Sequence, residues 1–429
     1  MVASGLRRFS WLRGISMGGG WRVWFGILLV TGGTASNAGD WPQILGPKRD
    51  GWAEGEQISL PWPASGPRLV WQRPCGRGFA GVAVRQKLGI LFHRLDDAEY
   101  VTAFEAATGR TLWEQHFPTN YRAQIVEDDG PRCVPTLADD TVVVLGAEGG
   151  LHALRLHDGQ VLWSHALAKE FQAPEGYFGF GSAPLVVGDR VIVNVGGPQG
   201  AGVVAFALDD GRVLWKQSNE LASYSAPIVY GGPDAPLVLM VTRLHFLGLD
   251  PLTGRERFRL PFGMRGPTVN AASPVVWQDH VLLTASYGIG ARWIHLHPQG
   301  AELVWEDEIP ASQYTTPVVF RGVVYALDGR QDVGTARLLC FDPSTRRILW
   351  SQQPLNYGTL VAAGDKLLLQ QTEGTLRVMA LDPTSYRELA RHRLLSGTTR
   401  ALPAFAAGRW FLRNENTLAC FELTASSDH

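Results

Sequence analysis

The residue types that usually carry enzyme chemistry fall into no recognised catalytic spacing in this 429-residue sequence. It contains no GxSxG, HExxH or Walker phosphate loop, and no zinc-type spacing of Cys and His. The run Gly176–Ser182 alternates glycine with aromatic residues, but it precedes a predicted strand and therefore lacks the helix N-terminus that binds phosphate. The histidines are scattered, and four that lie in strand-like segments are predicted to be structural: His152, His245, His295 and His297.

A second set of side chains recurs at one place in a repeated pattern and favours binding over catalysis. Segments such as Ser182–Val186, which reads Ser-Ala-Pro-Leu-Val, recur along the chain, often with Tyr or Arg just before them. Tyr and Arg are enriched among the residues that dominate protein–protein binding. The residues before these segments form the candidate binding site: Arg132, Tyr177, Tyr224, Asn270, Tyr314, Tyr357 and Arg400. The alternative is that they only fill a central channel and hydrogen-bond loop amides.

The elements that must position these residues follow from an eleven-residue frame with a small residue first, an acidic residue third, Gly seventh and Trp eleventh. The clearest copy is Ala103–Trp113, with Glu105 and Gly109 in the frame. An acidic residue and Gly suit a tight turn, and Trp offers a flat apolar face to a neighbouring unit. Later copies begin at Ala153, Ala205, Gly248, His295 (degenerate), Cys340 and Ala380, the last with Ala390 in place of Trp.

Each copy predicts four short strands: the Pro-containing segment, an alternating apolar run such as Arg190–Asn194, the Ala-x-Asp strand and the Trp strand. Successive Trp positions lie 40 to 52 residues apart, as four-stranded blades require. An eighth copy is split between Leu418–Leu423 and Leu69–Trp71. The sequence therefore predicts an all-β fold: a single eight-bladed β-propeller with four-stranded antiparallel blades, closed by pairing of the N- and C-terminal strands.

The frame resembles the tryptophan-docking repeat of quinoprotein alcohol dehydrogenases and of the outer-membrane assembly propeller lipoproteins. It is more similar still to exported PQQ-binding-like β-propeller repeat proteins of the type abundant in planctomycetes. Those proteins also open with phrases like Asp40–Gln43 and Gly46–Gly51, then Trp62-Pro63, Gly66-Pro67 and Trp71, and Pro131–Thr136 looks like the start of their second blade. The resemblance covers roughly residues 40 to 423 and implies the fold; the same propeller hosts both enzymes and binding scaffolds.

The sequence supplies few of the parts that a quinoprotein dehydrogenase would need. The resemblance implies a PQQ cofactor, a Ca²⁺ ion and a carboxylate base. Calcium takes about six to eight oxygen ligands, but the acidic residues fall mainly in the turn frame or in loops such as Glu127–Asp129. The adjacent cysteine pair of that family is missing as well. We therefore predict no cofactor, and keep a PQQ-dependent alcohol dehydrogenase-like oxidoreductase, with PQQ and calcium, as the alternative.

The first 38 residues are predicted to be a signal peptide. Four arginines precede or border the apolar run Val23–Val30, which is too short to span a bilayer, and Ser36–Ala38 places small residues at a cleavage site. An uncleaved anchor is the alternative, and Met17 is an alternative start. No membrane insertion is predicted after cleavage. The predicted organisation is a signal peptide at 1–38, an N-terminal extended segment at 39–66, the propeller at 67–424 and a tail at 425–429.

The charge of the chain bears on its partners, and its cysteines bear on disulfides. The net charge of −1 and the absence of a Lys/Arg run argue against nucleic acid. The four cysteines are predicted to be mostly thiols, because Cys340 and Cys420 fill the same frame position in blades that are not neighbours. Cys75 and Cys133 are the only pair that could meet. The resulting hypothesis is a periplasmic or otherwise exported, non-enzymatic scaffold whose channel-mouth loops bind an envelope protein, a peptide or a small anionic ligand.

Overall fold

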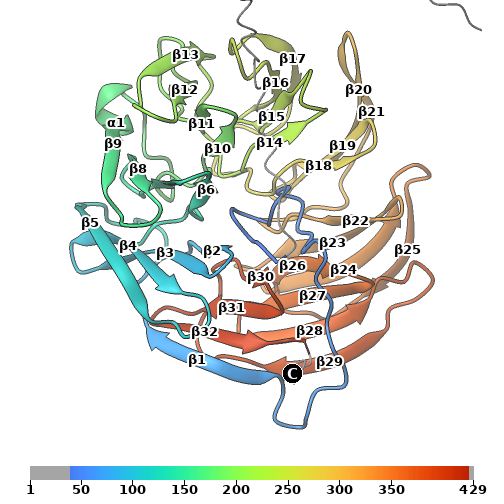
Figure 1. The fold of residues 1–429 in the computed structure, drawn as a ribbon. Helices are drawn as coiled ribbons and strands as arrows, with labels where there is room; N and C mark the ends of the chain where they lie inside the picture. Colours follow the sequence, from blue (N-terminus) through green and yellow to red (C-terminus); the bar gives the residue numbers. More distant parts are fainter. Residues whose placement is uncertain (1–38, 425–429) are drawn as a thin grey trace, which may run out of the picture. The chain divides into compact units, whose positions relative to one another are not determined.

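Eight four-stranded antiparallel sheets form a closed ring in the computed structural model, which describes residues 39–424 (Figure 1). The predicted signal peptide, its cleavage site and the predicted tail at 425–429 lie outside the described residues. Each sheet is one blade, so the predicted eight-bladed β-propeller is confirmed. Within residues 39–424, no helix is both long and apolar enough to cross a bilayer.

The first four blades follow the chain. Blade 1 contains β2 (Val82–Arg85), β3 (Leu88–Leu95), β4 (Ala98–Glu105) and β5 (Thr111–Pro118). Blade 2 contains β6 (Thr136–Ala138), β7 (Thr141–Leu145), β8 (Gly150–Arg155) and β9 (Val161–Ala166), followed by the single turn α1 (Leu167–Glu170). Blade 3 contains β10 (Leu185–Val187), β11 (Arg190–Asn194), β12 (Val203–Ala207) and β13 (Val213–Gln217). Blade 4 contains β14 (Ile228–Tyr230), β15 (Leu237–Val241), β16 (His245–Leu249) and β17 (Glu256–Pro261).

The last four blades complete the ring. Blade 5 contains β18 (Val275–Trp277), β19 (His280–Ala285), β20 (Gly290–His297) and β21 (Gly300–Asp307). Blade 6 contains β22 (Val318–Phe320), β23 (Val323–Arg330), β24 (Thr335–Asp342) and β25 (Arg347–Gln352). Blade 7 contains β26 (Gly358–Ala363), β27 (Lys366–Gln371), β28 (Thr375–Ala380) and β29 (Glu388–Arg393). Blade 8 contains β30 (Ala404–Ala406), β31 (Arg409–Arg413), β32 (Thr417–Glu422) and the N-terminal strand β1 (Arg68–Pro74).

The ring closes through the split repeat. Strand β1 pairs antiparallel with β32, with Trp71 opposite Cys420. An ion pair of 2.8 Å between Arg68 and Glu422 lies at the edge of the same pair of strands. The predicted pairing of the two ends of the propeller is therefore confirmed.

In six of the eight blades the tryptophan of the frame joins the blade to the next one. The Nε1 of Trp163 donates a 2.9 Å hydrogen bond to the carbonyl oxygen of Leu208, in the turn between β12 and β13. A Cβ atom built on Gly211 would lie 2.7 Å from the Trp163 ring, so only glycine lets the indole lie this close. Gly211 also has a φ of 75°, in the left-handed region that favours glycine. Five other indoles make the equivalent bond to the next blade: Trp71, Trp113, Trp215, Trp305 and Trp350.

In two blades the predicted frame is wrong by two residues. In most blades the first frame residue lies opposite the eleventh, as Ala103 lies opposite Trp113. In blade 5, however, Trp305 faces Trp293 rather than His295. In blade 7, Ala390 faces Val378 rather than Ala380. The hairpin between these paired positions contains two more residues in both blades, as longer strands around a short turn in blade 5 and as a longer turn in blade 7. Counting back ten positions from the fourth strand therefore ends two residues too late.

The cysteines are all free, including Cys75 and Cys133. Cys340 faces Trp350 and Cys420 faces Trp71, so both occupy the small-residue position of the frame as predicted. They belong to blades 6 and 8, which are not adjacent in the ring. A disulfide between them would require Cα atoms within about 7 Å.

Residues 39–66 contain no helix or strand, and their chain crosses the middle of the ring (Figure 1). Trp41 forms a β-bridge with Val84 of blade 1, and Trp52 forms one with Ala362 of blade 7. The Glu56 carboxylate accepts hydrogen bonds from the amides of Ala407 and Gly408 in blade 8. This N-terminal segment therefore contacts blades on both sides of the point of closure.

Arg49 anchors the N-terminal segment in the channel. Its side chain is 1% exposed, and it donates to the carbonyl oxygen of Pro227 at 2.9 Å, to that of Pro184 and to the Thr136 hydroxyl. Pro184 and Pro227 directly precede β10 and β14, so their carbonyl groups stand at the start of the innermost strands, which line the channel. Burial lowers the pKa of the Arg49 guanidinium to about 9, which leaves it charged at neutral pH.

We expect Trp163→Ala to lower the free energy of unfolding by about 3–5 kcal/mol, because it empties a large site between blades 2 and 3. Trp163→Phe should have a smaller effect, since it keeps most of the ring and loses the bond to Leu208. Urea unfolding measures both changes. The matched control is Leu162→Ala, whose side chain is already 38% exposed; an equal loss in this control would contradict the docking role of the indole.

We expect Arg49→Met to destabilise the ring by at least about 2 kcal/mol, because it leaves buried carbonyl oxygens without a donor. Limited proteolysis should then cut within residues 39–66 before it cuts the blades. Lys48→Met is the control, since the Lys48 side chain is 66% exposed. Resistance of the Arg49 variant to cleavage, at wild-type stability, would show that the guanidinium does not hold the segment.

Candidate functional site

Equivalent loops from six blades meet around one small pocket, which we call the mouth cup. Its lining includes the residue four positions before the first strand of each of these blades: Arg132, Gly181, Tyr224, Ala271, Tyr314 and Arg400. Ile44 and Leu45 of the N-terminal segment also line it, and the segment anchored by Arg49 lies in the channel behind them. The cup has a volume of about 140 Å³. At this end the propeller channel is therefore a shallow pocket, and the N-terminal segment blocks its floor.

The seven predicted site residues divide into three groups. Arg132, Tyr224, Tyr314 and Arg400 line the mouth cup. Tyr177 and Asn270, together with Tyr224, line a larger neighbouring pocket of about 390 Å³, which we call the side pocket. Tyr357 lies deeper, 2% exposed, and its hydroxyl accepts hydrogen bonds from the amides of Gln313 and Tyr314 at 2.6 and 3.1 Å.

Sequence reasoning missed part of the cup. Gly181 and Ala271 occupy the same repeat position as Arg132 and Tyr224, but their small side chains carry no chemistry that would mark them. Asn270, the residue predicted in place of Ala271, is displaced by one position into the side pocket. The aromatic and amide walls were missed as well: Phe79, Phe178, Tyr287 and Gln313. A strict count of four residues back from each first strand finds Gly181 and Ala271, but it does not find these walls.

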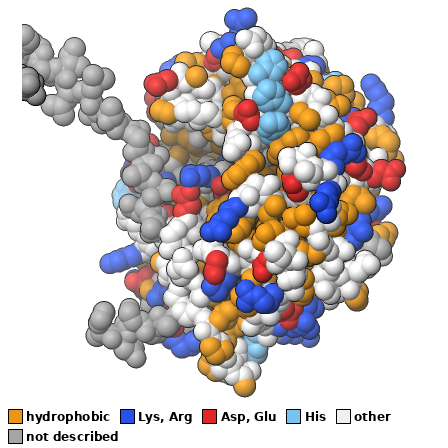
Figure 2. Space-filling model, turned by 90° about the vertical axis from the view of Figure 1, so that its right-hand side faces the viewer, with side chains coloured by type: hydrophobic (Ala, Val, Ile, Leu, Met, Phe, Trp, Pro, Cys, Tyr) orange, Lys and Arg blue, Asp and Glu red, His pale blue; other side chains and the backbone are white. Residues whose placement is uncertain are grey.

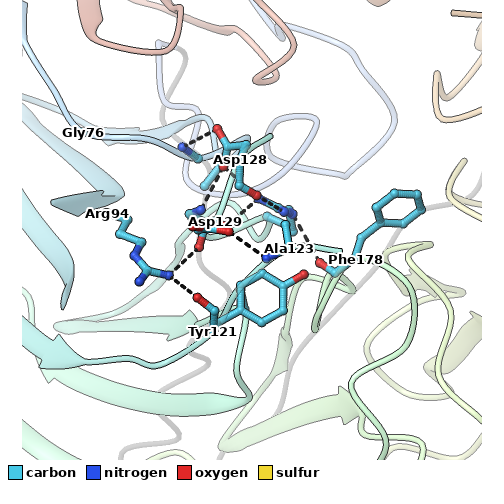
Figure 3. A network of polar contacts seen from close by, with 12 residues as sticks. Gly76, Arg94, Tyr121, Ala123, Asp128, Asp129 and Phe178 are labelled. Atoms are coloured by element: carbon cyan, nitrogen blue, oxygen red, sulfur yellow. Dashed lines mark hydrogen bonds and ion pairs between the residues drawn. The ribbon is translucent and has the colours of Figure 1, made fainter. Parts of the chain in front are cut away.

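Arg132 is held by a carboxylate inside the protein. It pairs with Asp128 at 2.9 Å, and both side chains are 7% exposed. Asp128 also accepts hydrogen bonds from the amides of Gly78 and Gly130 at 3.0 and 2.8 Å. Figure 3 shows Asp128 and Asp129 in a polar network that extends to Arg94 and Tyr121. The charge of Arg132 is therefore compensated, and its position is fixed.

Arg400 has a different environment. Its guanidinium carbon lies 4.7 Å from the centroid of the Phe79 ring and 5.0 Å from that of Tyr314. Cation–π contacts of this kind stabilise a guanidinium without neutralising it. Among residues 39–424, no carboxylate lies within ion-pair distance of Arg400. Arg400 thus brings an uncompensated positive charge to the cup.

Two tyrosines of the cup, Tyr224 and Tyr314, remain neutral. Burial raises the pKa of Tyr224 to about 12, and its hydroxyl accepts a 2.8 Å hydrogen bond from the amide of Phe178. Burial likewise raises the pKa of Tyr314, whose hydroxyl donates to Gln331 Oε1 at 2.8 Å. Neither phenol can serve as a base near neutral pH, so both contribute shape and hydrogen bonds.

The side pocket lies between the loop that precedes blade 3 and the loop that precedes blade 5. These loops touch where the Tyr177 hydroxyl donates to the carbonyl oxygen of Gly266 at 3.4 Å. Arg243 is tied to the second loop through the carbonyl oxygens of Met264 and Gly266. Asn270 Nδ2 donates to the carbonyl of Thr242 at 3.0 Å, which fixes the orientation of its amide. These hydrogen bonds hold Arg243 and Asn270 in place on one wall of the pocket, which could accept a side chain from a partner.

The cup does not fit a calcium–quinone pair. None of its lining residues is Asp or Glu, so it offers neither carboxylate ligands for Ca²⁺ nor a carboxylate base. Pockets for drug-sized molecules usually measure about 300–1,000 Å³, well above the 140 Å³ of the cup. In the part of the chain that the structure describes, no group of three or more His, Cys, Asp and Glu residues could hold a metal ion.

No histidine among residues 39–424 lines the cup. His280, His295 and His297 form a row in blade 5, with neighbouring ring centroids 5.0 and 5.8 Å apart. Figure 2 shows histidine side chains gathered in a band on the face that it draws. His152 stacks on Phe117 with ring centroids 3.5 Å apart, and burial lowers its pKa to about 4. These contacts agree with structural roles.

Structural comparison places the ring among known propellers. It superposes on BamB from Moraxella catarrhalis with a TM-score of 0.63 and 15% identity, covering 84% of this chain and 99% of that one. A europium-containing methanol dehydrogenase gives a TM-score of 0.67 and 12% identity, covering 87% and 89% of the two chains. At these identities the likeness concerns the fold alone, which BamB and the methanol dehydrogenase share.

Sequence comparison is more specific. BamB of Escherichia coli (strain K12) is 27% identical over 267 residues, which cover 58% of this chain and 62% of the relative. The Salmonella typhimurium (strain LT2) protein is 24% identical over 268 residues, with the same coverage. The matches thus span less than two thirds of the length of these curated relatives. The family model described as outer membrane protein assembly factor BamB matches residues 97–352, more than half of the chain. The resemblance to assembly propellers is confirmed, and the chain belongs to the outer membrane protein assembly factor BamB family.

Proposed function

We propose that this chain is an exported, non-enzymatic scaffold that binds a protein of the cell envelope through the loops around the mouth cup. The observation that carries the proposal is the convergence of equivalent loop positions from six blades on one closed pocket. A site built from many blades gains a rigid frame, because each loop begins and ends in a packed strand. The relatives are named outer membrane protein assembly factors, which supports a protein or peptide partner and an extracytoplasmic location.

The chemistry of the cup favours recognition over turnover. Its lining combines Arg132 and Arg400 with Phe79, Tyr224 and Tyr314, residue types that dominate binding hot spots. The side pocket lies next to it and shares Tyr224, so a partner segment could contact both. The lining of the cup has no carboxylate, and Tyr224 and Tyr314 stay neutral, so none of these groups is suited to abstract a proton from an alcohol.

The alternative, a quinone-dependent dehydrogenase, is favoured only by the likeness of the fold to a methanol dehydrogenase. Adding PQQ and Ca²⁺ and recording the visible spectrum, then measuring dye-linked turnover of alcohols, tests it directly. Specific binding with turnover would replace the scaffold proposal.

We expect Tyr224→Ala to weaken capture of a partner from envelope extract by about 1–2 kcal/mol, because Tyr224 separates the cup from the side pocket and faces both. Arg132→Ala should weaken capture too, but it should also lower stability, since it leaves Asp128 buried and unpaired. Thermal melts and binding isotherms on the same proteins separate the two effects.

Arg212→Ala is the control for this experiment. Arg212 lies in the turn between β12 and β13, at the end of blade 3 opposite to the mouth, and its side chain is 66% exposed. Wild-type capture by a folded Tyr224 variant, or an equal loss in the Arg212 variant, would place the binding surface elsewhere on the propeller.

A further inference from the structure

The size of the mouth cup limits what can enter it. Its 140 Å³ can hold one side chain or one small terminal group. Ile44 and Leu45 line it, and behind them the N-terminal segment fills the channel, so a longer group could not pass through. A partner that uses the cup therefore inserts a single group from the solvent side.

The charge balance of the cup favours an anionic group. Two guanidinium groups contact the Phe79 ring, that of Arg132 at 4.8 Å and that of Arg400 at 4.7 Å. Asp128 compensates Arg132, whereas Arg400 has no carboxylate partner among residues 39–424. A concave, partly desolvated site strengthens the attraction between such a cation and an incoming anion.

One carboxylate that contacts the wall of the cup, that of Asp332, is already engaged. Asp332 accepts a 2.9 Å hydrogen bond from Gln313 Nε2 and pairs with Arg330, and it does not line the cup. Gln313 Nε2 also donates to the Tyr287 hydroxyl at 2.9 Å. These bonds hold the amide and phenol walls in place, so the cup is organised before a ligand arrives.

From this geometry we infer that the mouth cup binds one carboxylate group of the protein partner, with Arg400 as the residue that recognises its charge. The carboxylate is either an acidic side chain or a chain terminus, which share the same chemistry. The planar guanidinium of Arg400 can give two parallel hydrogen bonds to it while its faces remain against the rings of Phe79 and Tyr314. This inference rests on the proposed scaffold function and names the chemistry of the group that it captures.

Saturation-transfer NMR with short peptides tests the inference, because it detects weak ligands. The probes are Ac-Gly-Gly-Glu-Gly-Gly-amide, its Gln counterpart, and Ac-Gly-Gly-Gly-Gly with a free terminus. We expect the Glu peptide, the free-terminus peptide or both to bind, and the Gln peptide to bind at least about tenfold more weakly, as expected for a lost charge-assisted hydrogen bond. The stronger of the two acidic peptides identifies the source of the carboxylate.

Arg400→Gln should reduce binding of the acidic peptide at least about tenfold, and Arg400→Lys should retain part of it. Arg212→Gln, at the opposite end of blade 3, should leave it unchanged, and melts should show all three variants folded. Equal binding of the Glu and Gln peptides, or equal loss in the Arg400 and Arg212 variants, would overturn the inference. If acidic peptides fail to bind while Tyr224→Ala still weakens partner capture, the inference fails and the scaffold proposal stands. If acidic peptides bind through Arg400 but Tyr224→Ala leaves partner capture unchanged, the scaffold proposal fails instead.

Discussion

An indole N–H of one blade donates to the turn carbonyl of the next, and the ring depends on the repetition of this contact. The indole can reach the turn because a glycine, such as Gly211 below Trp163, leaves room for the ring. Two of the eight positions carry no indole, namely Phe258 and Ala390. At the second, the N-terminal segment joins the same two blades, through Gly51 and Ala53 to Ala362 in blade 7 and through Glu56 to blade 8. The N-terminal segment thus links blades 7 and 8, one of the two blade pairs that lack an indole contact, but it does so at β26 and the turn between β30 and β31 and not at β29.

The sequence predicted the ring well because one frame encodes both ends of each contact. Trp, its small partner and the turn glycine recur at fixed distances, and the two halves of the split copy correctly predicted that the strand with Leu69–Trp71 pairs with the strand with Leu418–Leu423. The errors arose where the hairpin of the third and fourth strands contains two more residues, as at His295 and Ala380, because a fixed spacing does not account for an insertion. The site was harder to predict. Gly181 and Ala271 contribute backbone and space rather than chemistry, and Phe79 reaches the cup from a blade whose entrance loop departs from the pattern.

The two arginines of the cup show why residue type alone did not define the site. Arg132 and Arg400 occupy the same position in their blades and touch the same ring, Phe79. Asp128 lies four residues before Arg132 and pairs with it, so Arg132 contributes to the stability of the fold. At the corresponding place before Arg400 stands Ser396, which carries no charge. Their difference therefore comes from neighbours that a list of candidate side chains does not include.

The position of the N-terminal segment also determines which contacts can form only at the end of synthesis. Residues 41–74 are made before any blade, yet several of their partners, in β26, in the turn between β30 and β31 and in β32, are among the last to be made. The paired side chains of Arg68 and Glu422 lie 354 residues apart in sequence. Contacts across such a distance form late, because a long loop must close before they stabilise anything. Glu56 and β1 therefore stay without these partners until the eighth blade exists, and their docking closes the ring.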